Sequence, residues 1–193
     1  MLSWFENLLN PFPNKEIDSP PNALWPFLWA CTSGSRLLIL AMTLFTALIG
    51  GFEALLFAAM GKVVDWLSKT TPELLWSSEK HHLLLLVTLL LLSPLLIAMQ
   101  TLIKHQTLAG NFPMRLRWNF HQLMLSQSMS FYQDEFAGRV AAKVMQTALA
   151  VRDVWFIVAD ILVFVVIYFV TMVAVVGHFN STVMWPFVVW VIC

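Results

Sequence analysis

Charged residues are scarce in this chain of 193 residues: only 11 % are Asp, Glu, Lys or Arg, whereas soluble domains have about 25 %. The 11 basic and 11 acidic side chains cancel, so the formal net charge is zero. So little charge cannot cover a water-exposed surface of the usual kind, which argues strongly against a soluble enzyme. The sequence also lacks a basic block, so it gives no electrostatic basis for binding nucleic acid.

Cysteine is almost absent as well, and the two cysteines, Cys31 and Cys193, lie far apart in the sequence. A disulfide framework needs more cysteines and a zinc site needs closely spaced pairs. Both are therefore interpreted as apolar membrane residues. The adjacent His81 and His82 lack the spacing of metal ligands on a helix, and no catalytic set of side chains is identifiable. We expect no metal site.

Apolar residues, in contrast, make up 59 % of the chain. An α-helix needs about 20 residues to cross about 30 Å of hydrocarbon. Three apolar runs are longer than this, and we predict membrane spans at residues 37–61, 83–103 and 154–177. A fourth run at residues 183–193 covers only about half a membrane, so we interpret it as a partial span in a truncated chain. The sequence predicts an all-α membrane protein.

Residues 1–35 are expected to form a leader with an interfacial helix at about residues 22–32. This segment carries Trp25 and Trp29, and indole side chains prefer the membrane–water interface; a disordered aromatic leader is the alternative. Eight Lys and Arg residues lie in residues 1–36 and 104–153, against three in the other loops. Positive residues stay cytoplasmic, so we expect the N-terminus and residues 104–153 in the cytoplasm.

The cytoplasmic stretch at residues 104–153 is predicted to be a helical hairpin. From Met114, apolar residues recur at three- and four-residue steps, and from Gly138 they come close to the same rhythm, which indicates two helices. The second span would continue outward as a helix, turn, and return into the third span. Pro113 is expected to kink or interrupt the outgoing limb, and Gly138 suits the turn before the returning limb.

Three aromatic residues and two acids lie between the limbs: Phe131, Tyr132, Phe136, Asp134 and Glu135. Exposed aromatic side chains beside acids, at the tip of a long hairpin, are typical of a docking surface for another protein. In the alternative interpretation, the aromatic side chains only pack the two limbs together. Local sequence alone leaves both interpretations open.

Two acids, Glu53 and Asp160, lie inside apolar runs. Placing such a residue at the centre of a spanning helix costs about 2.5–3.5 kcal/mol, so these acids mark a pathway or have a partner. Glu53 would face a substrate cavity that favours cationic compounds, or else hydrogen-bond a neighbouring span or extend to the interface. Asp160 is nearer the end of its run, where it would lie at the interface or pair with a basic residue.

Several segments follow one another in a recognisable order. Phe131–Arg139 is the most specific: a small-x-Phe-Phe/Tyr pattern, a short polar run, and Gly138-Arg139, with the basic Lys143 four positions on. Less specific segments lie at residues 24–29 (LWPFLW), 55–67 and 184–190. Together, over roughly residues 22–193, they resemble the transmembrane type-1 domain of ATP-binding-cassette (ABC) exporters of the lipid-flippase and multidrug type.

The resemblance implies a mechanism in which ATP closes two nucleotide-binding domains and coupling helices carry that motion to the spans. Phe131, Tyr132 and Phe136 would then be the ball of a ball-and-socket joint on a nucleotide-binding domain, with Asp134 and Glu135 as its polar rim. It also implies long helices extended into the cytoplasm, a dimer with another half-transporter, contact with membrane lipid, and a bacterial inner (plasma) membrane location.

The 193 residues contain no Gly-x-x-x-x-Gly-Lys-Ser/Thr phosphate loop. The chain as it stands is therefore expected to be no enzyme and to bind no cofactor; ATP and Mg²⁺ would bind to a nucleotide-binding domain in a full-length family member. The favoured function is the membrane-spanning part of an exporter, truncated and not transport-competent alone. The alternative is a complete small membrane adapter that docks a cytoplasmic partner through residues 104–153. A membrane enzyme is disfavoured, because no nucleophile or metal cluster is evident.

Overall fold

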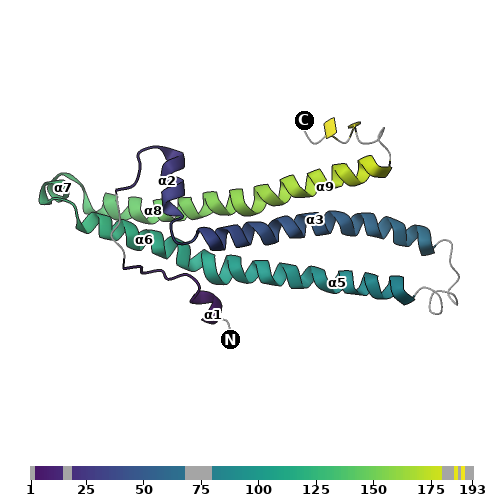
Figure 1. Ribbon diagram of the computed structural model, residues 1–193. Coiled ribbons are helices and arrows are strands. Elements are labelled where there is room, and N and C mark those ends of the chain that lie inside the picture. The colour runs from purple at the N-terminus through teal and green to yellow at the C-terminus, as the bar shows by residue number, and fades with distance from the viewer. Residues whose placement is uncertain (1–2, 15–18, 68–79, 180–184, 187, 190–193) are drawn as a thin grey trace. The chain divides into compact units, whose positions relative to one another are not determined.

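The computed structural model describes residues 3–14, 19–67, 80–179, 185–186 and 188–189 (Figure 1). Every regular element in these ranges is a helix, which confirms the all-α prediction for this part of the chain. The predicted fourth span lies largely outside it. In chain order the helices are α1 (Ser3–Glu6), α2 (Leu24–Cys31), α3 (Arg36–Leu67), α5 (Lys80–Thr101), η1 (Leu102–Leu108), α6 (Ala109–Leu125), α7 (Met129–Asp134), α8 (Ala137–Phe156), η2 (Ile157–Leu162) and α9 (Val163–Phe179), where η1 and η2 are π-helical.

Three continuous helical stretches are long and apolar enough to cross a membrane: Arg36–Gly61, Val87–Leu125 and Ala137–His178. The second and third contain 39 and 42 residues, about twice the number that a membrane needs. The prediction that the second span continues outward as a helix, and that a helix returns into the third, is therefore confirmed as far as helical continuity is concerned.

Pro113 does not interrupt the outgoing helix, so the interruption expected from the sequence is absent. A proline inside a helix removes an N–H group and clashes with the preceding turn, at a cost of about 3 kcal/mol. Here Pro113 is buried between Phe112 and Leu116, which are 0 % and 1 % exposed. Packing of this stretch offsets the local cost. The irregular hydrogen bonding of this helix occurs upstream of Pro113. There the N–H of Ala109 donates to the carbonyl of Lys104, five residues earlier, as in a π-helix.

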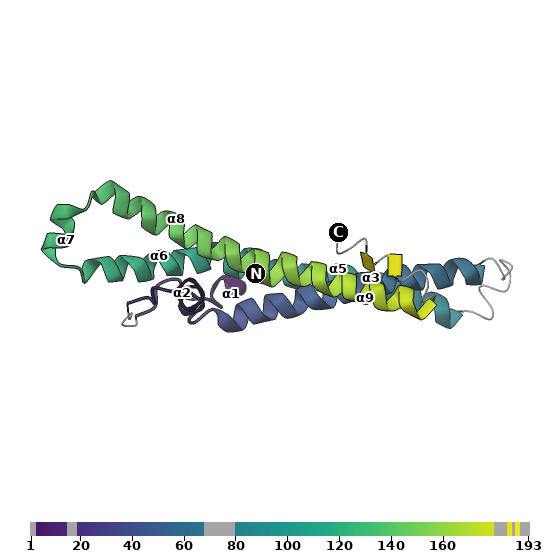
Figure 2. The ribbon, with the colours of Figure 1, turned by 90° about the horizontal axis from the view of Figure 1, so that it is seen from above.

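The chain divides into two units, which are described separately. The first comprises Met1–Met42 and Thr101–Asp160, and the second comprises Thr43–Gln100 and Ile161–Cys193. In the first unit, α6 and α8 run side by side and α7 joins them at the far end (Figures 1 and 2). This is the helical hairpin that the apolar periodicity predicted.

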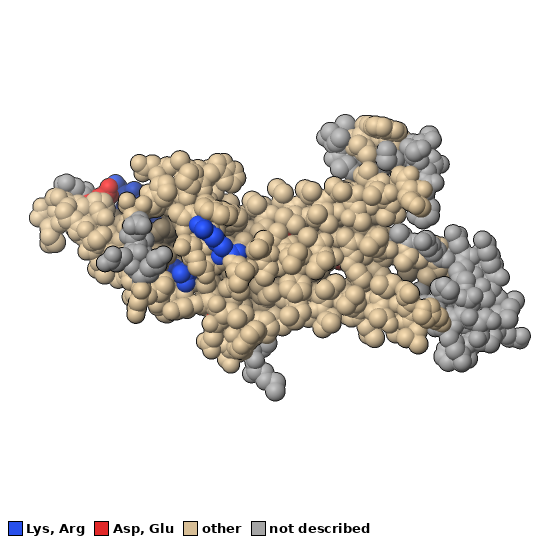
Figure 3. Space-filling model, in the orientation of Figure 1, with Lys and Arg blue, Asp and Glu red and all other residues tan. Residues whose placement is uncertain are grey.

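The second unit joins parts of α3, α5 and α9. The side-chain amide of Gln100 donates to the hydroxyl of Thr46, at 3.3 Å. A Cβ atom on Gly50 would lie 3.3 Å from the carbonyl oxygen of Phe164, and such small residues let membrane helices approach closely. The visible surface of the second unit is almost entirely free of Lys, Arg, Asp and Glu (Figure 3). A surface that faces lipid requires such a lack of charge.

The N-terminal leader, in the first unit, docks along the outgoing limb through its backbone. Four side chains of η1 and α6 donate hydrogen bonds to four leader carbonyl groups. These are Thr107 to Phe5 (2.9 Å), Asn111 to Glu6 (2.7 Å), Arg115 to Asn10 (2.9 Å) and Trp118 to Pro13 (3.2 Å). The donors recur at four- and three-residue intervals, so they lie on one helix face. Nothing in the sequence analysis predicted this arrangement.

The turn between α2 and α3 depends on Gly34, whose φ is +81°. Only glycine adopts this backbone region without a steric penalty. The guanidinium of Arg115 also packs against this turn, because a Cβ atom added to Gly34 would lie 2.1 Å from its Nη2. Arg115 therefore connects the outgoing limb to both the leader and the start of the first span.

Helix α2 lies where the sequence predicts an interfacial helix. Trp25 and Trp29 are 71 % and 56 % exposed. The indole N–H of Trp155 on α8 donates to the carbonyl of Leu28 at 3.3 Å, which fixes α2 against the returning limb. The guanidinium of Arg36 lies 4.6 Å from the ring centroid of Trp29, a favourable cation–π contact.

Candidate functional site

The short helix α7 at the end of the hairpin carries the predicted docking residues. Ser128 begins it, and its side-chain oxygen accepts a hydrogen bond from the N–H of Phe131 at 3.4 Å, as serine commonly does at this position. Glu135 and Phe136 then take extended backbone conformations that need no glycine. Gly138 lies in the first turn of α8, so the turn comes earlier in the chain than predicted.

The aromatic residues of the tip differ in exposure. Phe136 is 78 % exposed, and Met129 at the start of α7 is 76 % exposed. Phe131 is half-buried, with its ring centroid 5.4 Å from that of Tyr132. The hydroxyl of Tyr132 donates to the carbonyl of Met124, which fastens α7 to the outgoing limb. Tyr132 is thus tied to the outgoing limb although it is 41 % exposed, and the docking role of Phe131, Tyr132 and Phe136 stays a prediction.

The described charged side chains of the tip, Glu135 and Arg139, are partly exposed. Glu135 and Arg139 form an ion pair at 3.9 Å between side chains that are 33 % and 66 % exposed. An exposed pair of this kind contributes little to stability, about 0–1 kcal/mol. The side chain of Asp134 is not among those that the structure describes. The tip therefore combines two protruding apolar side chains with a weakly held charged rim.

A groove of about 390 Å³ lies between the two limbs next to α7. Its wall is mainly apolar, and Arg117, His121 and Tyr132 contribute polar atoms. The remaining lining residues are Met124, Leu125, Ala137, Val140, Ala141, Val144 and Met145. The limbs thus separate near the tip instead of packing tightly along their whole length.

At the other end of the limbs, Lys104 and Asp160 form a hydrogen-bonded ion pair. Their side chains are 24 % and 12 % exposed, and the Lys104 ammonium also lies 5.8 Å from the ring centroid of Phe156. This confirms that Asp160 is paired with a basic residue. Both partners belong to π-helical segments, η1 and η2, an irregularity that is frequent at functional sites.

Glu53 lies in α3, in the second unit, three residues after Gly50. Its side chain is half-buried. Its role in a substrate cavity stays a prediction, because Glu53 lines neither the groove next to α7 nor the cavity beside Cys31. Within the described residues, no three His, Cys, Asp or Glu side chains are arranged to hold a metal ion.

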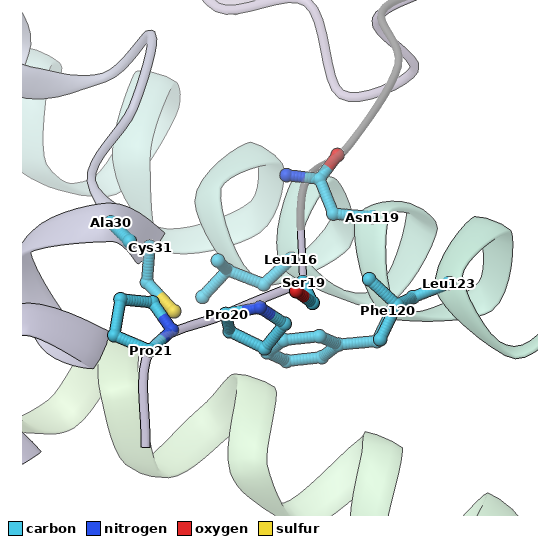
Figure 4. A pocket seen from close by; sticks show the side chains of 9 residues that line it. All are labelled: Ser19, Pro20, Pro21, Ala30, Cys31, Leu116, Asn119, Phe120 and Leu123. Atoms are coloured by element: carbon cyan, nitrogen blue, oxygen red, sulfur yellow. The ribbon is translucent and has the colours of Figure 1, made fainter. Parts of the chain in front are cut away.

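A second cavity, of about 310 Å³, lies between the leader, α2 and α6 (Figure 4). Its lining comprises Ser19, Pro20, Pro21, Ala30, Cys31, Leu116, Asn119, Phe120 and Leu123. Cys31 is 8 % exposed, and burial raises the pKa of its thiol from 9.0 to about 11. Because only the thiolate is a nucleophile, this cysteine is expected to be inert near neutral pH.

In a Cys193→Ser variant, alkylation of Cys31 at pH 8 should be roughly 100-fold slower than that of a free thiol, since two pKa units lower the thiolate fraction by this factor. The rate should rise about tenfold per pH unit until the pH nears the pKa. Mass spectrometry after timed iodoacetamide treatment measures both. Labelling at the rate of a small thiol would show that the leader and α6 do not cover this cysteine.

Comparison with known proteins gives one informative similarity. The chain is 48 % identical, over 192 residues, to a Haemophilus influenzae protein named "Uncharacterized ABC transporter ATP-binding protein". The similarity covers 100 % of this chain and 31 % of that protein, so the chain spans about a third of its relative. No family model matches, and no solved structure matches. The similarity supports a function related to ABC transporters.

Proposed function

We propose that this chain forms part of the transmembrane domain of an ABC exporter of the lipid-flippase or multidrug type. The observation that carries the proposal is the length of the two helices that α7 joins. At about 1.5 Å per residue, the 39 residues of Val87–Leu125 extend about 58 Å, against about 30 Å of hydrocarbon. The excess forms a rigid arm, and its tip exposes the apolar side chains of Phe136 and Met129.

In this proposal the tip is a coupling helix that docks on a nucleotide-binding domain outside the chain. The name of the Haemophilus influenzae relative and its greater length support such a domain, as does the lack of a phosphate loop in these 193 residues. ATP and Mg²⁺ bind there, so this chain alone hydrolyses no ATP. The Lys104–Asp160 pair at the base of the arms holds the two helices in register, so that they move together.

The membrane arrangement follows from the same geometry. The excess of Lys and Arg in the leader and hairpin favours a cytoplasmic N-terminus and a cytoplasmic tip, in a bacterial inner membrane. The apolar windows of the second and third candidate spans are each only 6 % buried by this chain. We propose that lipid and a second half-transporter cover them.

Docking of Phe136 gives the first test. Burying an aromatic side chain of 150–250 Å² stabilises an interface by about 4–6 kcal/mol before opposing costs, and truncating a central one costs about 2 kcal/mol or more. In the transporter assembled with its nucleotide-binding domain, Phe136→Ala should lower transport-coupled ATP hydrolysis at least about tenfold. Hydrolysis is compared with and without transported substrate in proteoliposomes.

Gln146→Ala is the matched control, because Gln146 is exposed on α8 away from the tip and its truncation should leave coupling unchanged. Tyr132→Phe should instead lower thermal stability slightly, by removing the hydrogen bond to Met124. Equal coupling in Phe136→Ala and in the unmodified transporter would contradict the docking role.

Orientation gives the second test. Ser126 is exposed at the end of α6, so Ser126→Cys, in a variant without the natural cysteines, should react with a membrane-impermeant maleimide only after the cells are permeabilised. The readout is a gel shift with a maleimide-linked polymer. Labelling in intact cells would place the tip outside the cytoplasm and overturn the proposed contact with a nucleotide-binding domain.

A further inference from the structure

The N-terminal helix α1 and the residues after it expose apolar side chains that no described residue covers. Trp4, Leu8 and Phe12 are 64 %, 40 % and 50 % exposed. Glu6 is the sole charged residue among residues 3–14, and its carboxylate accepts a hydrogen bond from the Gln106 side chain on η1. Residues 3–14 therefore expose an aromatic and aliphatic surface, and their one charged side chain is hydrogen-bonded to the outgoing limb.

The contacts of α1 fix its position along the axis of the outgoing limb. Thr107 and Asn111 donate to the carbonyl groups of Phe5 and Glu6, so α1 lies about one turn beyond the apolar run that ends at residue 103. Indole side chains prefer the boundary just beyond the hydrocarbon. Trp4 is therefore at the depth where a tryptophan is most stable in a membrane protein.

Helix α2 contacts both limbs: Phe27 stacks on Phe120 of α6, with 6.3 Å between the ring centroids, and Leu28 contacts α8. The ion pair between Lys104 and Asp160 sets the register of the antiparallel limbs, which places residues 107–111 level with residues 153–157. Trp155, whose indole N–H holds Leu28 of α2, lies within that range. Figure 1 shows α1 and α2 on opposite sides of the limbs.

We propose that α1 and the residues directly after it form a second interfacial anchor, which inserts Trp4 and Leu8 into the lipid headgroup region on the side of the limbs opposite α2. The proposal rests on the proposed membrane insertion of the spans. Exposed aromatic and aliphatic residues on a short helix bind the boundary between headgroups and acyl chains. The occupant is lipid, because α1 sits where the apolar run leaves the hydrocarbon and the carboxylate of its one charged residue, Glu6, is hydrogen-bonded to Gln106.

With this anchor, the leader contacts the membrane interface at its beginning, through α1, and at its end, through α2. From α1 the leader follows α6 away from the apolar run, since Asn10 is held by Arg115 and Pro13 by Trp118. The chain then returns to the interface at α2. The outgoing limb is thus attached, through the leader, to lipid on two sides.

Depth-dependent fluorescence quenching tests the anchor in the full chain. In a Cys31→Ser, Cys193→Ser background, three exposed positions receive single cysteines: Asn7→Cys beside the anchor, Asn14→Cys beyond Trp118, and Leu90→Cys within the second span. Each is labelled with an environment-sensitive fluorophore. The protein is reconstituted in vesicles of phosphatidylethanolamine and phosphatidylglycerol that contain phosphatidylcholine spin-labelled at headgroup level or at mid-chain.

Fluorescence at position 7 should be lost with the headgroup-level label, and fluorescence at position 90 with the mid-chain label. Position 14 should respond to neither and should be quenched by aqueous iodide. Adding Trp4→Gln and Leu8→Gln should abolish the loss at position 7, while the Lys104–Asp160 pair and the spans stay intact.

Each other outcome overturns a distinct claim. If position 7 shows no lipid quenching while position 90 is quenched at mid-chain, the anchor is wrong and the membrane assignment stands. If position 90 is also unquenched, the proposed membrane insertion itself is wrong. Protection of position 7 from both iodide and lipid quenchers would show that a protein surface covers α1, which also overturns the anchor.

Discussion

Replacing Gly34 with alanine should destabilise the protein by at least about 2 kcal/mol. An L-residue with side chain in the left-handed region costs about 1–2 kcal/mol, and Gly34 has a φ of +81°. The added Cβ atom would also lie 2.1 Å from Nη2 of Arg115, so the guanidinium must leave the turn and weaken its hydrogen bond to Asn10. The midpoint temperature of unfolding in detergent, followed by loss of the monodisperse peak, measures the effect.

Gly138→Ala provides a matched control for this prediction. Gly138 is in the first turn of α8, and a Cβ atom there would have no neighbour within 4 Å. Alanine is more favourable than glycine within a helix by about 0.5–1 kcal/mol, so the midpoint should stay level or rise slightly. If both alanine variants behave alike, neither the turn geometry nor the Arg115 contact at Gly34 has the role assigned to it.

Breaking the Lys104–Asp160 pair should cost about 3 kcal/mol. Both side chains are largely buried, and removing one partner of such a pair leaves a charge that is neither solvated nor neutralised. Lys104→Met and Asp160→Leu should therefore each lower the midpoint temperature of unfolding. The double variant Lys104→Met/Asp160→Leu should recover most of the loss, because it leaves no unpaired charge.

The four proteins form a double-mutant cycle that isolates the interaction between the two side chains. Glu135→Gln is the comparison in a more exposed pair, since Glu135 and Arg139 are 33 % and 66 % exposed, and it should change stability by less than about 1 kcal/mol. Additive losses in the double variant would mean that Lys104 and Asp160 act independently, and the two limbs would then need another source of register.

The long helices were predictable because their physical requirement is simple. A spanning segment must be continuously apolar over about 20 residues, and this pattern is plain in α3, α5 and α9. The limbs were predictable from the period of their apolar residues, and α2 from its tryptophans. The pairing of Asp160 followed from the cost of an isolated charge in an apolar run.

The remaining features depend on contacts between segments that are distant in sequence. Propensity alone places a break at Pro113, but burial of Phe112 and Leu116 outweighs it. The role of Gly34 could not be predicted from the sequence, because the side chain that packs against it is Arg115, which lies far away in the sequence on α6. The polar stripe of Thr107, Asn111 and Arg115 marks a helix face with a polar partner, yet it does not reveal which segment that partner is.

The way the leader is held has an evolutionary consequence. Its four donors bind carbonyl groups only, which every amino acid possesses, and Pro11 and Pro13 restrict the path through their fixed φ. Selection for these four hydrogen bonds therefore acts on the donor helix more than on the identity of the residues that accept them. Related sequences should keep the donor positions more strictly than Phe5 and Asn10, whose carbonyl groups two of them bind.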